Sequence, residues 1–167
     1  MAVQAELRER FRGMVALYAG AIRRLAAVYV ANAADRDDLV QEILLAVWRA
    51  LPGFRGDASE RTWLYRIAHN VALTYRRKRN RASDREAPLE EGMNDSRPGV
   101  DVRKLALARL VSQLPLEDRQ LVVLYLEGLS ASEIEKITGI RAGTVSVRLT
   151  RIRQNLAGAF QRPEVTP

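Results

Sequence analysis

Four arginines and no acidic residue occupy the stretch GIRAGTVSVRLTRIR at residues 139–153. The arginines are Arg141, Arg148, Arg151 and Arg153. A guanidinium group can fork onto the edge of a guanine or neutralise a phosphate, so the chemistry offered here is noncovalent, salt-dependent binding of nucleic acid. An apolar series at helical spacing in the same stretch predicts a helix with one buried face. Its members are Val145, Leu149, Ile152 and Leu156.

A second candidate surface lies in GFRGDASERTWLYRIAHNVALTYRRKRNR at residues 53–81, where basic and aromatic side chains interrupt an apolar series. Basic side chains can follow a phosphate backbone, and aromatic rings among them can stack on exposed bases, so this pattern is typical of a surface that binds nucleic acid. Five of the six residues 76–81 are basic, which gives Arg76, Arg77 and Lys78 as DNA contacts. Two alternatives stay open: Trp63 as a core anchor, and His69 and Asn70 as structural residues.

Acidic side chains gather at the start of the segment DRDDLVQEILLAVWRAL, residues 35–51. They are Asp35, Asp37, Asp38 and Glu42. A nucleic-acid enzyme could use such carboxylates as metal ligands, but no second carboxylate cluster completes a two-metal site. The chain has no cysteine and one histidine, which excludes disulfides, thiolate sites and a histidine metal cluster. We predict no cofactor, no metal and no enzymatic activity. The acids fit either the helix dipole or a protein partner.

The chain has 167 residues and a formal net charge of +7, which suits one or two small globular domains and a polyanionic partner. Residues 83–103 carry 3 basic and 6 acidic side chains, with prolines, glycines and no sustained period, and are predicted to be an interdomain linker. No apolar run reaches the roughly 18 residues that span a bilayer, and the first residues lack the apolar core of a signal peptide. We therefore expect a cytoplasmic protein without membrane insertion.

The rest of the chain is predicted to be all-α, as two small helical domains at residues 1–82 and 104–160 joined by the flexible linker. Helical spacing of apolar residues covers 7–30, 35–51, 62–79, 104–114, 116–127, 130–138 and 142–160. Ser59 or Asp57 is expected to cap the third helix. Ser130 and Glu133 form a capping-box pattern, and Gly139 stands where a left-handed residue would end a helix.

The last two predicted helices have the layout of a helix-turn-helix, a short capped helix followed by a glycine turn and a longer helix. The second helix of such a motif enters the major groove with its first residues nearest the base edges. Thr144, Arg148 and Arg151 form a stripe beside the apolar face, and Arg141 continues it. The motif therefore predicts binding of duplex DNA through this stripe.

Two blocks of the chain, in order, resemble the extracytoplasmic-function (ECF) class of bacterial sigma factors. The first is DRDDLVQEILLAVWRALPGFRGDASERTWLYRIAHNVA, and the second is LPLEDRQLVVLYLEGLSASEIEKITGIRAGTVSVRLTRIRQNL. The resemblance implies a sigma-two domain at 1–82 and a sigma-four domain at 104–160, which bind the minus-10 and minus-35 promoter elements. It also implies two protein partners. One is core RNA polymerase, bound through its beta-prime clamp helices and its beta flap, and the other is an anti-sigma factor.

Site residues follow from the resemblance by position. The helix with DLVQE would bind polymerase through Asp38, Gln41 and Glu42. The loop matching FRGDAS would capture a base flipped from the minus-10 element, and the next helix would contact the DNA beside it. The residues implied are Phe54, Arg55, Gly56, Asp57, Arg61, Trp63, Arg66 and Asn70. The minus-35 element would be read by Arg141, Thr144, Ser146, Arg148 and Arg151.

Two positions depart from the family pattern. Val147 stands where members commonly carry a polar residue, and Glu135 stands in the first helix of the motif where members usually carry a small residue. Its carboxylate is expected to reach solvent or to pair with Lys136 or an arginine of the recognition helix. The function predicted is that of a sigma factor which directs promoter recognition and opening. The alternative is a helix-turn-helix regulator that acts without being a polymerase subunit, although the N-terminal block has no evident use in such a protein.

Overall fold

The computed structural model describes residues 2–83 and 102–161. The chain divides into two compact units, which we call the N-terminal unit, built on helices α1–α3, and the C-terminal unit, built on α4–α7. No strand occurs within these described ranges, so the predicted all-α class with two helical regions is confirmed. None of the helices described is long and apolar enough to cross a membrane.

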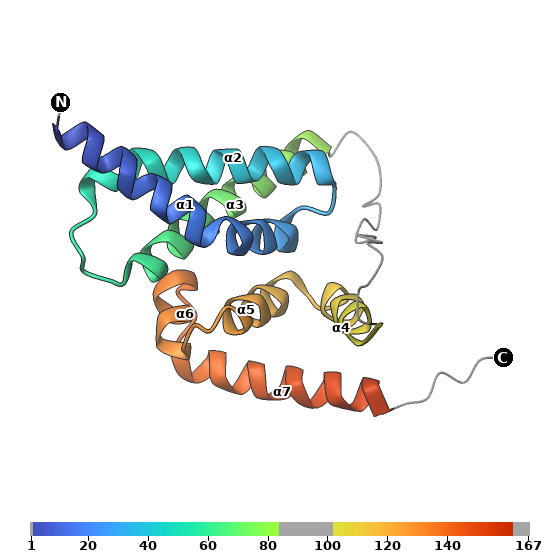
Figure 1. The fold of residues 1–167 in the computed structure, drawn as a ribbon. Coiled ribbons are helices and arrows are strands. Elements are labelled where there is room, and N and C mark those ends of the chain that lie inside the picture. Colours follow the sequence, from blue (N-terminus) through green and yellow to red (C-terminus); the bar gives the residue numbers. More distant parts are fainter. Residues whose placement is uncertain (1, 84–101, 162–167) are drawn as a thin grey trace. The chain divides into compact units, whose positions relative to one another are not determined.

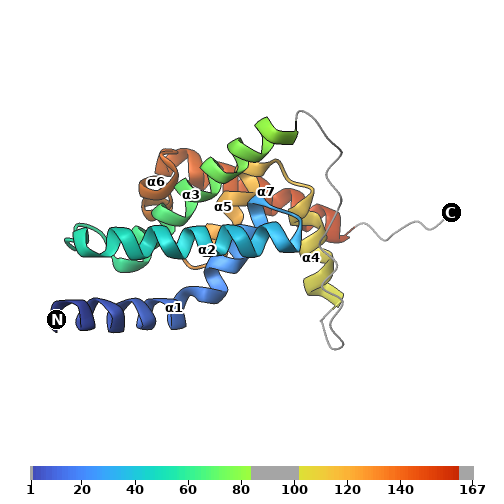
Figure 2. The same cartoon turned by 90° about the horizontal axis from the view of Figure 1, so that it is seen from above.

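The N-terminal unit is a packed set of three helices (Figures 1 and 2). They are α1 (Ala2–Tyr29), α2 (Ala33–Ala50) and α3 (Glu60–Ser83), with a short 3-10 turn, η1 (Leu51–Gly53), after α2. The side chain of Asn32 caps α2 by accepting from the backbone N–H of Ala34 at 2.9 Å. Apolar side chains from all three helices, including Ile22, Ile43 and Leu64, are fully or almost fully buried and form the core.

The C-terminal unit contains α4 (Val102–Ser112), α5 (Leu116–Leu126), α6 (Ala131–Thr138) and α7 (Ala142–Gln161). Its core joins Leu121 and Leu124 of α5, Ile134 of α6, and Val145 and Leu149 of α7, all buried. The expected apolar face of residues 142–160 is therefore the one that packs inward, and its arginine-bearing faces are left outside or against α5.

Helix boundaries agree with those expected from the sequence to within two residues, except at the start of α1 and at the end of α3, which runs to Ser83 instead of residue 79. Helix α1 begins at Ala2 rather than at residue 7, because residues 2–6 include good helix formers that show no apolar period of their own. The predicted linker at 83–103 lies outside the described residues except at its ends, which close α3 and open α4. Ser59 caps α3, since its Oγ accepts from the N–H of Thr62 at 3.1 Å, and Asp57 does not take that role.

Candidate nucleic-acid and polymerase interfaces

The loop between η1 and α3 presents the residues predicted to capture a base. Arg55, Gly56 and Asp57 are exposed, and Gly56 has a φ of 81°, in the left-handed region that favours glycine. Phe54 opens the loop and packs its ring against that of Trp63, with centroids 4.9 Å apart. Both rings are half-buried. Trp63 therefore belongs to the loop's support and is neither a free surface ring nor a fully buried core anchor.

One face of α3 continues this surface. Trp63, Arg66 and Asn70 recur at three- and four-residue spacing, and Arg66 and Asn70 are exposed. His69 is instead buried, and a hydrogen bond of 2.5 Å joins its Nδ1 and the hydroxyl of Tyr29. Burial lowers the pKa of His69 and raises that of Tyr29, so both are neutral inside the core. His69 is therefore a structural residue, which is the second of the two roles considered for it from the sequence.

The basic run at the end of α3 is divided between solvent and helix α2. Arg77 and Lys78 are exposed and Arg76 is half-buried, whereas Arg79 forms an ion pair with Asp35. Burial would lower the pKa of Arg79, but hydrogen bonds to Tyr75 and Asp35 and the charge of Asp35 raise it overall. Arg79, which is paired with an acid of α2, is thus not among the predicted DNA contacts. Those contacts are Arg76, Arg77 and Lys78.

A groove of about 530 Å³ lies between α2 and α3. Its lining includes Glu42 from the predicted polymerase interface and Asn70 and Lys78 from the predicted DNA interface. Leu45 and Arg49 of α2 and Thr74 of α3 line it as well. The predicted polymerase residues Asp38, Gln41 and Glu42 are all exposed on α2. Leu45 extends their face by one turn and leaves 47% of its surface exposed. Leu45 was missed by the sequence analysis, although its spacing from Gln41 was a visible signal.

In the C-terminal unit, α6, the turn and α7 have the predicted helix-turn-helix layout. Ser130 and Glu133 form the capping box, with Ser130 Oγ accepting from the N–H of Glu133 at 3.2 Å and the carboxylate of Glu133 accepting from the N–H of Ser130 at 2.8 Å. Gly139 adopts a φ of 77° at the end of α6. Glu135 is exposed, and its Oε2 accepts from the N–H of Ala142 at 2.9 Å. It therefore caps the recognition helix, and no ion pair of Glu135 with Lys136 or an arginine is found in the described part of the chain.

The four arginines of the opening stretch separate into two pairs. Arg141 and Arg151 are exposed, and the described residues provide no ion-pair partner for either. Arg148 and Arg153 turn toward α5, where the guanidinium of Arg153 lies 5.7 Å from the centre of the Tyr125 ring. Thr144 is exposed on the same face as Arg141 and Arg151. Ser146 is also exposed, but helical geometry places it on another face of α7, so the structure does not bring it together with the other predicted readers.

Arg148 lies in an ion-pair cluster with the first turn of α5. Its Nε donates to Oδ1 of Asp118 at 2.8 Å, Nη2 lies 2.6 Å from the same oxygen, and Nη1 and Nη2 each lie 3.2 Å from Oε2 of Glu117. The side chain of Asp118 is 12% exposed and that of Arg148 is 21% exposed. Burial would lower the pKa of Arg148, but hydrogen bonds to Asp118 and Glu117 and their charges raise it overall. Neither acid was predicted as a partner, because Glu117 and Asp118 lie 31 and 30 residues before Arg148 in the chain, with all of α6 between them.

The described residues hold no group of three or more His, Asp or Glu side chains arranged as a metal site. What the fold and these faces define is a two-unit helical protein that carries a helix-turn-helix. One unit places exposed basic side chains beside half-buried aromatic rings, and the other places exposed arginines beside a threonine.

Comparison with known proteins gives the family. A family model described as Sigma-70 region 2 matches residues 14–82, and one described as Sigma-70, region 4 matches residues 104–156. The ECF RNA polymerase sigma-E factor of Escherichia coli is 33% identical, over 95% of this chain and 91% of its own length. The ECF RNA polymerase sigma factor SigM of Mycobacterium tuberculosis is 33% identical, over 81% of this chain and 69% of its own.

Two solved structures share the fold. The structure of CnrH in complex with the cytosolic domain of CnrY matches with a TM-score of 0.65 at 25% identity, over 92% of this chain and 88% of that one. The sigma factor RpoE of Bartonella quintana, in complex with the anti-sigma factor NepR, matches with a TM-score of 0.77 at 23% identity, over 92% and 98%. This chain belongs to the ECF sigma factors of bacterial RNA polymerase. It acts as a polymerase subunit at promoter DNA, and the alternative of a regulator independent of polymerase was wrong.

Proposed function

We propose that the two units divide promoter recognition between them. Residues 1–82 bind core polymerase and the minus-10 element, residues 83–103 link the units, and residues 104–160 bind the minus-35 element. The observation that carries this proposal is that each unit places basic residues beside exposed polar or aromatic ones on a single face. In the N-terminal unit the face joins the loop at 54–57 to Arg66 and Asn70, and in the C-terminal unit it joins Arg141 to Arg151.

The loop in the N-terminal unit would hold a base extruded from the minus-10 element. Unstacking a base from a duplex costs about a few kcal/mol, so a protein that binds the extruded base shifts the duplex toward opening without covalent chemistry. Exposed Arg55, Asp57 and Arg66 provide polar contacts, and the paired rings of Phe54 and Trp63 provide an apolar wall. Arg61, Gly56 and Asn70 complete the proposed set, and Arg76, Arg77 and Lys78 would follow the phosphates.

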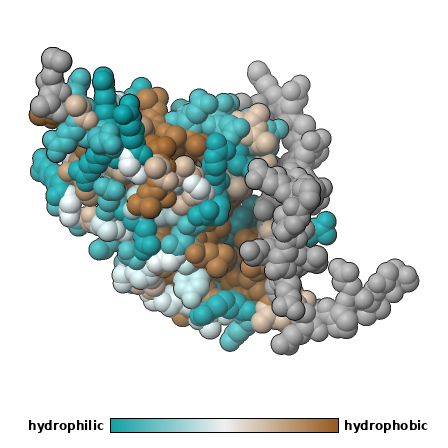
Figure 3. Space-filling view, in the orientation of Figure 1, coloured by the Kyte–Doolittle hydropathy of each residue, from teal (hydrophilic) through white to brown (hydrophobic). Residues whose placement is uncertain are grey.

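Core polymerase would dock on the exposed face of α2. Asp38, Gln41 and Glu42 provide its polar part, and Leu45 provides an apolar contact one turn further on. A polar face with one exposed leucine is suited to a helical partner such as the beta-prime clamp helices. Figure 3 shows hydrophobic side chains among hydrophilic ones at the surface of the N-terminal unit. The C-terminal unit would in addition contact the beta flap.

In the C-terminal unit, α7 would lie in the major groove of the minus-35 element. Arg141, Thr144 and Arg151 form the exposed face from which base edges and phosphates can be reached. Ser146 remains in the proposed set, as a phosphate contact from a different face of α7. Arg148 also remains in the proposed set. Its guanidinium already binds two acids of α5, so a contact with DNA would have to share it with them.

The relatives support a regulated, nonenzymatic protein. CnrH and the RpoE of Bartonella quintana were solved in complex with CnrY and the anti-sigma factor NepR. By analogy, we propose that an anti-sigma factor binds this chain and holds it inactive. A DNA-recognition subunit needs no catalytic group of its own, so we propose that the chain has no enzymatic activity and works in the cytoplasm with polymerase.

The proposal is tested by adding the purified chain to bacterial core RNA polymerase and transcribing a pool of genomic fragments. The expected result is core binding and start sites that share a two-part upstream motif. A chain with Asp38 and Gln41 both changed to alanine is the matched control, since it should keep duplex binding by α7 and lose core binding. Duplex binding without core association in the parent chain would contradict the assignment of α2. Metal-dependent nuclease activity would contradict the absence of catalysis.

A further inference from the structure

Arg10, in α1, bridges the two ends of the loop between η1 and α3. Its Nε and Nη2 donate to Oε2 of Glu60 at 3.3 and 3.1 Å, and its guanidinium carbon lies 4.9 Å from the centre of the Phe54 ring. Phe54 opens the loop and Glu60 is the first residue of α3. One side chain therefore joins the start of the loop to its end, across the exposed residues that carry the proposed contacts to the extruded base.

The position of Arg10 is itself fixed by its neighbours on α1. The ring of Phe11 packs edge to face against Trp48 of α2 with centroids 5.3 Å apart, and Met14 is 2% exposed. The turn that carries Arg10 is thus held against α2 independently of the loop. Residues 2–13 precede the segment that matches Sigma-70 region 2, so this brace comes from a part of the chain that the family match does not cover.

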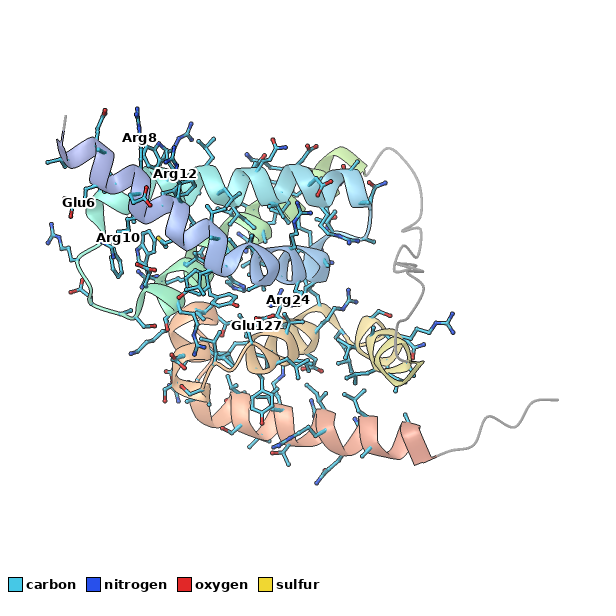
Figure 4. The ribbon with its side chains drawn as sticks, in the orientation of Figure 1. Glu6, Arg8, Arg10, Arg12, Arg24 and Glu127 are labelled. Carbon is cyan, nitrogen blue, oxygen red and sulfur yellow. The ribbon has the colours of Figure 1, made fainter. Side chains whose placement is uncertain are left out.

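The neighbouring arginines of α1 do not share this position. Figure 4 shows Arg8 and Arg12 on one side of α1 and Arg10 on the side toward the loop. Arg12 lies 3.7 Å from Glu9 and is 77% exposed, and Arg8 is exposed as well. Arg8 carries the same charge on the same helix without touching the loop residues, which makes it a matched control.

We propose that Arg10 is a positioning residue for the loop between η1 and α3, residues 54–59, which we call the capture loop. Arg10 sets the conformation of this loop and so the base that the loop accepts. The proposal rests on the proposed function of that loop. Glu60 orients the guanidinium, the guanidinium holds the ring of Phe54, and that ring lies against Trp63 at 4.9 Å. Without Arg10 the loop keeps its sequence but loses the contact that joins its two ends, so base capture becomes less selective.

A direct phosphate contact by Arg10 is the competing explanation, since 42% of its side chain is exposed. The two explanations differ in what Glu60 does. A loss of Glu60 removes a negative charge, which should strengthen nonspecific binding to DNA, whereas a loss of Arg10 should weaken it. If the pair positions the loop, both changes nevertheless lower the selectivity for one base.

The experiment uses holoenzyme made with the full chain and single-stranded oligonucleotides that carry the minus-10 sequence found with the parent chain. Each position is varied through the four bases, and the ratio of affinities for preferred and other bases is measured. Arg10→Ala and Glu60→Gln should each reduce that ratio by about threefold to tenfold, the size expected for an exposed ion pair with a cation-π contact. Arg8→Ala should leave it unchanged.

Arg10→Lys keeps the charge but not the fork, and should restore less than the full ratio. Equal weakening of every oligonucleotide by Arg10→Ala and Arg8→Ala, with the base ratio intact in Glu60→Gln, would overturn the proposal in favour of a phosphate contact. If the parent holoenzyme prefers no base at any position, the proposed capture function of the loop fails first. Failure of the positioning role is distinct from that, because it requires a parent preference that survives the loss of Arg10.

Discussion

Replacing Arg148 by alanine should destabilise the C-terminal unit by about 2–3 kcal/mol, because among the described residues it leaves Asp118 with no ion-pair partner. The side chain of Asp118 is 12% exposed, so its carboxylate cannot recover full hydration where it stands. The other acid adds little, because the side chain of Glu117 is 70% exposed and an exposed pair contributes about 0–1 kcal/mol. Arg151→Ala, one turn along α7, removes an exposed arginine and should change stability by less than about 0.5 kcal/mol.

Native-state hydrogen exchange of the amides of α7 is the suitable assay, since buried Val145, Leu149 and Ile152 anchor that helix in the core. Both tryptophans, Trp48 and Trp63, lie in the N-terminal unit, so their fluorescence serves as an internal control that should not change. Unchanged protection of the α7 amides in the Arg148 variant would refute the reasoning.

Binding of duplex minus-35 DNA separates two roles for Arg148. If Arg148 holds α7 against α5, Asp118→Asn should weaken DNA binding, since the recognition helix loses its anchor. If Arg148 reads a base directly, Asp118→Asn should leave binding unchanged or strengthen it, because the arginine is released and a negative charge is removed. We expect weaker binding, together with a coupling of about 1–2 kcal/mol between the two positions in a double-mutant cycle for stability.

Three further predictions concern other contacts. Glu135→Ala should destabilise the C-terminal unit by about 1 kcal/mol, because the N–H of Ala142 loses its cap, and Glu135→Gln should recover part of this in hydrogen exchange. Burial lowers the pKa of His69 from 6.5, so unfolding takes up a proton and stability present at neutral pH is lost as the pH falls below about 6.5. Urea unfolding followed by tryptophan fluorescence should show this loss, and His69→Phe should remove it. Changing Asp38 and Gln41 together should weaken core binding in a pull-down while duplex binding stays intact, and loss of both activities would instead indicate misfolding.

The helices could be predicted closely because their signals are local. The capping box at Ser130 and Glu133 and the left-handed Gly139 lie within ten residues of each other, and each acts through the backbone beside it. The apolar spacing of α7 likewise identified the face that is buried. The start of α1 was missed, since residues 2–6 form helix without an apolar stripe to mark it.

Partners of charged and polar side chains could not be predicted, because they depend on how helices pack. Arg148 is 30 residues from Asp118 in the chain, His69 is 40 from Tyr29, and Arg10 is 50 from Glu60. No periodicity within one helix indicates such pairs. The same limit explains Glu135, whose acceptor role became visible only when the turn brought the N–H of Ala142 to its carboxylate.

Those pairs change what the basic composition means. A net charge of +7 suggests a broadly cationic surface, yet acids from neighbouring elements neutralise particular arginines, as Asp35 does for Arg79 and Asp118 does for Arg148. Arg141 and Arg151 are exposed, and each could bind a phosphate without first breaking an ion pair within the described residues. We therefore expect the packing of acid-bearing helices, and not the count of basic residues, to decide which arginines DNA can use. On this view a paired arginine such as Arg148 first holds α7 in place, and any contact of its own with DNA requires that it share or break its ion pair.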